Sequence, residues 1–112
     1  VSFNEKSLKG YIQGLQDTTG VLDDQLRPAF STLIVSTGDY ETAQNLLNTA
    51  LDVSAGTTNN LETVSKALGK AYLGNFSALS KLNAGISKAD IATKNYDLIL
   101  KKLINIIFNI LY

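Results

Sequence analysis

Apolar residues recur along this chain at the three- and four-residue spacings of amphipathic helices, and no segment shows the strict alternation of a half-buried strand. We therefore predict an all-α fold, a compact antiparallel bundle of five to six helices that forms one domain over residues 1–112. The predicted helices cover about Glu5–Asp17, Val21–Ser36, Tyr40–Ser54, Asn59–Leu73, Phe76–Gly85 and a long apolar C-terminal helix that begins near Ser87.

The second predicted helix contains the only proline of the chain, Pro28. The apolar stripe keeps its helical phase from Leu22 and Leu26, before the proline, to Phe30 and Leu33 after it. Because two separate helices would not share this phase, we expect one helix that bends at Pro28.

Short polar residues mark several of the expected helix ends. Asn59 with Glu62 predicts a capping box for the fourth helix, and Ser87 with Asp90 predicts one for the last. Gly74 is expected to end the fourth helix, because glycine readily adopts the left-handed conformation of a helix C-terminus.

The last predicted helix is apolar over an unusually wide arc, and charged or amide side chains interrupt every long apolar run. These interruptions exclude a transmembrane segment. Three interpretations of the helix remain open. It is a central core helix, it lines a cavity for an apolar ligand, or it is an amphipathic helix that docks on a membrane or on another protomer.

Two fragments resemble tetratricopeptide repeats. Gly38–Ala43 is similar to the second helix of that repeat, and Leu68–Tyr72 is similar to the first. The spacing from Tyr72 to Gly74 is shorter than a standard repeat requires, and fewer than three repeats would fit. The resemblance therefore implies helix-turn-helix packing, and it assigns no peptide-binding residue.

The composition excludes many kinds of active site. The chain has no Cys and no His, which removes disulfides, thiolate nucleophiles, imidazole bases and the usual zinc ligands. The adjacent Asp23 and Asp24 would point about 100° apart on a helix, so they cannot readily share a proton or a metal ion. We expect no enzyme activity, no cofactor and no metal site.

The zero net charge conceals an asymmetry between the two halves of the chain. Residues 1–56 carry three basic and seven acidic residues, whereas residues 57–112 carry seven and three, so the formal charges are −4 and +4. The lysines are scattered and form no basic run, which argues against nucleic-acid binding. Opposite charges on the two halves suit head-to-tail association or simply offset each other within the fold.

The chain begins Val-Ser-Phe without an initiator methionine, and its single glycosylation sequon begins at Asn75. We expect an extracellular protein whose leader has been removed, with glycosylation possible at Asn75; a soluble cytoplasmic protein is the alternative.

Together these features predict a small, non-catalytic, secreted helical bundle that binds a lipid or another fatty-acid-like apolar ligand in its core. The alternative is a protein-interaction module or a self-assembling structural module such as a homo-oligomer, which uses the C-terminal helix and the opposite charges of its two halves. The expected ligand contacts are two tyrosines and four apolar residues of the last helix: Tyr72, Tyr96, Ile99, Leu103, Ile104 and Phe108.

Overall fold

The computed structural model describes residues 5–111, and the Val-Ser-Phe start on which the leader prediction rests lies outside them. The prediction of an all-α fold is confirmed, since residues 5–111 form helices and connecting turns without a strand. The helices are α1 (Glu5–Thr19), α2 (Asp23–Thr37), α3 (Tyr40–Gly56), α4 (Leu61–Tyr72), α5 (Ser77–Ser80), α6 (Lys88–Ala92) and α7 (Tyr96–Leu111).

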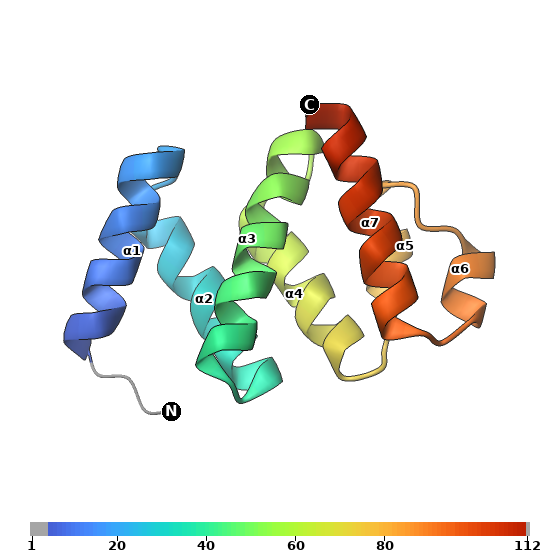
Figure 1. Cartoon of the computed structure of the whole chain (residues 1–112), viewed down its shortest axis with the longest axis horizontal. Coiled ribbons are helices and arrows are strands. Elements are labelled where there is room, and N and C mark those ends of the chain that lie inside the picture. The colour runs from blue at the N-terminus through green and yellow to red at the C-terminus, as the bar shows by residue number, and fades with distance from the viewer. Residues whose placement is uncertain (1–4, 112) are drawn as a thin grey trace.

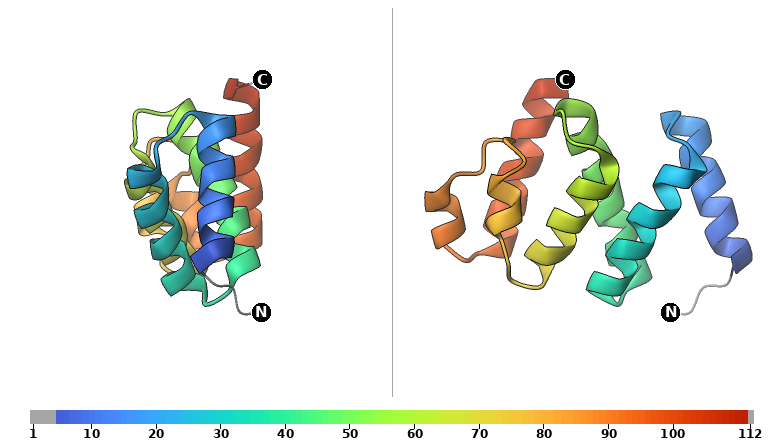
Figure 2. Two further views of the ribbon diagram at one scale, coloured as in Figure 1. Left: turned by 90° about the vertical axis from the view of Figure 1, so that its left-hand side faces the viewer. Right: turned by 180° about the vertical axis from the view of Figure 1, so that it is seen from behind.

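The helices form a thin, two-layered molecule that measures 43 × 28 × 18 Å (Figure 1). One layer contains α1, α3 and α7, which run in the same direction, and the other contains α2, α4 and the short α5 (Figures 1 and 2). Helices α2, α3 and α4 pack against one another and form the centre, while α1 lies outside α2 and α7 lies along α3. One broad side of the molecule therefore exposes α3 and α7 side by side.

A close helix contact joins α2 to α4 through small residues. A Cβ atom at Gly69 of α4 would lie 2.5 Å from the Ser36 Oγ and 3.0 Å from the Ser36 Cβ of α2. Around this contact, Leu33 and Leu68 are completely buried. Glycine at position 69 thus allows the two backbones to approach until the larger side chains above and below interdigitate.

The single second helix is confirmed, because α2 continues through Pro28. Its end is a left-handed Gly38 (φ 68°), whose N–H donates to the Ile34 carbonyl at 2.8 Å. Asp39 then caps α3 by accepting a hydrogen bond from the Thr42 N–H at 2.9 Å. Glycine and aspartate at adjacent positions therefore end one helix and begin the next.

The capping box predicted at Asn59 is wrong by one residue. Asn60 caps α4, since its side chain accepts a hydrogen bond from the Thr63 N–H at 2.8 Å. The Asn59 amide instead donates to the Leu82 carbonyl at 2.7 Å and to Thr57 Oγ1. This hydrogen bond connects the α3–α4 turn to the segment after α5. No local sequence pattern indicates such a long-range contact.

Two predictions for the C-terminal third are also wrong, and the described residues form seven helices instead of five or six. The predicted helix Phe76–Gly85 is helical only over Ser77–Ser80, and the positive φ of Asn83 (55°) and Gly85 (94°) prevents its continuation. The predicted long helix from Ser87 is divided into α6 and α7 by the turn Thr93–Asn95, where Lys94 has φ 52°.

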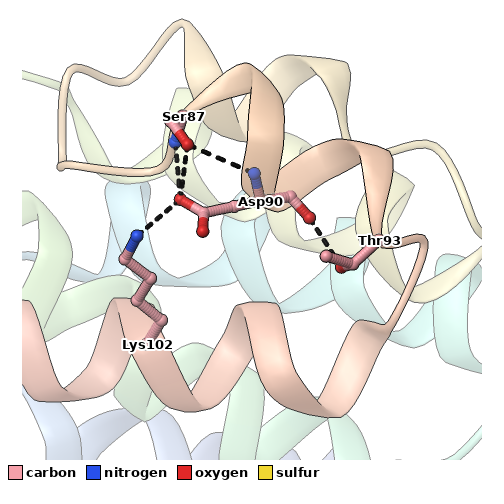
Figure 3. A network of polar contacts seen from close by, with 4 residues as sticks. All are labelled: Ser87, Asp90, Thr93 and Lys102. Atoms are coloured by element: carbon pink, nitrogen blue, oxygen red, sulfur yellow. Dashed lines mark hydrogen bonds and ion pairs between the residues drawn. The ribbon is translucent and has the colours of Figure 1, made fainter.

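The capping box predicted at Ser87 and Asp90 is confirmed (Figure 3). Asp90 Oδ2 accepts hydrogen bonds from the Ser87 N–H at 2.8 Å and from the Ser87 hydroxyl at 2.9 Å, and Lys102 Nζ of α7 lies 2.7 Å from the same oxygen. Helix α6 contains no buried residue. Polar contacts therefore account for much of the attachment of α6 to α7.

Candidate interaction surface

Helix α7 buries one face against α3. Ile99, Leu103 and Ile107 are at most 2% exposed, so Ile99 and Leu103, two of the predicted ligand contacts, belong to the core. Along this contact a Cβ atom at Gly56 of α3 would meet the Ile107 side chain at 3.5 Å. The buried face of α7 therefore fits the interpretation as a core helix.

The adjoining face of α7 leaves large apolar side chains in solvent. Ile104 is 45% exposed and Phe108 is 61% exposed. Both line a shallow pocket of about 130 Å³ between α3 and α7. We call this surface the α3–α7 face, and its residues are Asn48, Thr49, Asp52, Val53, Ile104, Ile107 and Phe108. It lies on a broad side of the molecule, where α3 and α7 are both in front in Figure 1.

Charged residues border the α3–α7 face on both helices. On α3, Glu41 and Asp52 are exposed and belong to the outer side of the helix. On α7, Lys101 is exposed and precedes Ile104 by one turn. No ion pair joins Glu41, Asp52 or Lys101 to another of the residues that the structure describes. Asp97, one turn before Lys101 on the same side of α7, is exposed as well. The apolar centre is thus flanked by acidic residues on α3, of which Asp52 also lines the pocket, and by one charge of each sign on α7.

The predicted tyrosines lie elsewhere, at the opposite end of α7. The rings of Tyr72 and Tyr96 meet edge to face with their centroids 5.6 Å apart. Burial raises the pKa of Tyr96 to about 12, and the neighbouring Tyr72 and Asp97 act in the same direction. Tyr96 and Phe108 are separated by 12 helical residues, about 18 Å along the axis, so the six predicted contacts do not form one site.

A second aromatic cluster attaches α1 to the centre of the molecule. The Tyr11 ring lies 5.0 Å from Phe30 and 6.1 Å from Tyr40, measured between centroids. Burial, with a smaller effect of Tyr40, raises the pKa of Tyr11 to about 12. The Tyr11 hydroxyl is buried and forms no hydrogen bond with the residues described. These rings pack the N-terminal helix against α2 and α3.

A wider depression lies at a place that the sequence did not indicate. It has a volume of about 430 Å³, opens to solvent beside the C-terminal end of α7, and contains Ile106 and Ile110 between two loops. None of the six predicted contacts lines it. Only the tertiary structure brings the loops Gly56–Thr58 and Leu82–Gly85 together here, so periodicity within one helix could not have revealed it.

Asn75, the predicted glycosylation site, is exposed in the turn after α4. Its side-chain oxygen accepts hydrogen bonds from the Ser77 N–H at 3.2 Å and from the Ser77 hydroxyl at 2.8 Å. The amide and the hydroxyl of the sequon are thus in direct contact on the surface, and glycosylation of Asn75 stays a prediction.

Within residues 5–111, no three potential metal-ligating side chains of His, Cys, Asp or Glu come together. In the same part of the chain, no helix combines the length and the apolar character needed to cross a membrane. The chain matches no protein-family model, no curated protein and no solved structure.

Proposed function

We propose that this protein is a non-catalytic, self-assembling structural module whose α3–α7 face binds a second copy of the chain. The observation that supports the proposal is the exposure of Ile104 and Phe108 beside a partly buried apolar pocket. Removing large apolar side chains of this kind from water contributes about 1.5–3 kcal/mol for each fully buried side chain. Exposed apolar groups that adjoin one another, with polar residues around them, are typical of association surfaces.

One charge on α7, that of Lys101, fits a second copy as the occupant of the face. A two-fold axis parallel to α3 and α7 would place each α7 over the α3 of the other copy. This arrangement brings the basic Lys101 towards Glu41 and Asp52, and it also brings Asp97 of α7 towards the same helix. Self-association would then pair charges that have no ion-pair partner among the described residues of one chain, and it would orient the two copies.

The shape of the molecule gives this interface enough room. A stable interface requires about 800 Å² on each partner. The α3–α7 face belongs to a side whose principal dimensions are 43 × 28 Å. A pocket of about 130 Å³ is, by contrast, smaller than the roughly 300–1,000 Å³ typical of small-molecule sites. The pocket therefore suits one inserted side chain better than a whole lipid.

Sedimentation velocity and light scattering over a wide concentration range test the proposal. We expect a reversible dimer that Phe108→Glu and Ile104→Glu dissociate, because each substitution places a carboxylate in the apolar centre. Leu98→Glu is the matched control, since Leu98 is 53% exposed on the same helix but does not line the pocket. A monomer at every concentration would refute the proposal, and a lipid-sized adduct on that monomer in native mass spectrometry would favour the apolar-ligand prediction.

A further inference from the structure

A basic groove lies between α4 and the segment that contains α5. Its volume is about 210 Å³. Three lysines and a threonine surround it, and small or apolar side chains form the rest of its lining. These residues are Thr63, Lys66, Lys70, Lys81, Ala67, Ala78 and Leu82. None of them belongs to the α3–α7 face, and no local pattern indicates the cluster, because Lys81 lies 11 residues beyond Lys70.

The positive charge of this groove is only partly neutralised. Lys66 Nζ lies 3.6 Å from the Glu62 carboxylate, and both side chains are more than half exposed, so the pair is weak. Lys70 and Lys81 form no ion pair with the described residues. Even with Glu62 counted, three lysines leave an excess of two positive charges around the groove.

The three lysines of the groove repel one another in the free protein. Lys66 and Lys70 are four residues apart on α4, and like charges at this spacing destabilise a helix. Lys81 brings a third positive charge from another segment to the same groove. An anion between the three ammonium groups would relieve this repulsion and would gain charge-assisted hydrogen bonds.

We propose that the groove binds a phosphate-bearing anion, either a free diphosphate-like molecule or the headgroup of an anionic phospholipid. Three separate ammonium groups match the several oxygens of a phosphate or diphosphate, and the Thr63 hydroxyl adds a fourth donor. The apolar floor that includes Ala67 and Leu82 excludes water from one side of the anion and thereby strengthens the attraction. The volume of about 210 Å³ accommodates such a group but not a helix.

Titration with inorganic pyrophosphate, followed by amide NMR shifts, tests the site. We expect saturable shifts centred on Thr63, Lys66, Lys70 and Lys81, together with a higher melting temperature that falls back as salt is added. Lys70→Gln and Lys81→Gln should each weaken binding about tenfold, since each removes one charged hydrogen bond. Lys9→Gln on α1 is the control and should bind as the wild type does.

Vesicles distinguish the two sources of the phosphate group. If vesicles of phosphatidylcholine and phosphatidate bind the protein, and pyrophosphate or Lys70→Gln prevents this, the ligand is a headgroup. If only free pyrophosphate binds, the ligand is a soluble anion. Shifts that do not saturate, or equal affinities in Lys70→Gln, Lys81→Gln and Lys9→Gln, would overturn the proposal. Binding of only an acidic peptide, without pyrophosphate, would likewise overturn it.

Discussion

The N-terminal and C-terminal regions of this molecule are held together in different ways. Helices α1–α4 have 12 to 17 residues each, and continuous apolar stripes pack the central ones against one another. In the C-terminal region, α5 and α6 have only four and five residues, and α7 packs mainly along α3. Helices α1–α4 leave only Val35 and Tyr72 as exposed large apolar side chains, whereas α7 at the edge leaves Leu98, Ile104, Phe108 and Ile110 exposed. The surface available for association therefore arises where the regular packing ends.

The largest effect is expected within α7 itself. Leu103→Ala should destabilise the protein by about 2–5 kcal/mol, because the completely buried side chain leaves a cavity. Phe108→Ala should cost less than about 1 kcal/mol in the monomer, since the ring is 61% exposed. Denaturant unfolding of both variants at low concentration measures the difference. Equal losses would mean that Phe108 belongs to the core and that the α3–α7 face is not an independent surface.

The close α2–α4 contact predicts the next effect. Gly69→Ala should destabilise by about 1–3 kcal/mol, because its methyl group would displace Ser36. Gly14→Ala on α1 has open space around the new methyl group and should stabilise by up to about 1 kcal/mol through helix propensity. Thermal melting of the two variants compares them. A stable Gly69→Ala variant would show that this region tolerates looser packing than the structure indicates.

A smaller effect is expected at Pro28. Pro28→Ala should stabilise by about 1 kcal/mol, because it restores a backbone donor within α2 and removes the steric conflict of the ring. The side chain is exposed, so the substitution leaves the core unchanged. Destabilisation in the same melting experiment would instead indicate that the proline fixes a bend on which the α2–α4 contact depends.

The smallest effect concerns the attachment of α6. The hydrogen bond from Lys102, followed by those from Ser87, lowers the pKa of Asp90 from 3.8 to about 2. Because the folded state favours the carboxylate, this contact stabilises α6 above about pH 4 and is lost as the pH falls towards 2. Carboxyl NMR titration should give a higher pKa for Asp90 in Lys102→Gln and an unchanged one in Lys101→Gln. Equal values in wild type and Lys102→Gln would show that the ion pair does not hold α6.

Local patterns were sufficient for most of the N-terminal region, the cap of α4 at Asn60 being the exception. The phase that runs through Pro28 identified α2, and the adjacent Gly38 and Asp39 separate it from α3. These predictions depend on residues within one or two helical turns, so the sequence contains all the information they require. The candidate surface was only partly predictable. The helical pattern places Ile104 and Phe108 away from the centre of the apolar arc. It does not predict which residues of α3 lie beside them.

The course of the C-terminal third shows what the sequence determined and what it left to the tertiary structure. The sequence alone determined that Ser87 and Asp90 begin a helix and that residues 96–111 are helical. The chain divides into two helices because Gly85 packs against the Ile106 side chain. A continuous helix would place Lys88 about 27 Å from Ile106 along its axis, whereas the three residues from Gly85 to Lys88 reach about 11 Å at most. The chain therefore has to reverse at Thr93–Asn95, because contacts between residues distant in sequence outweigh the local preference for a continuous helix.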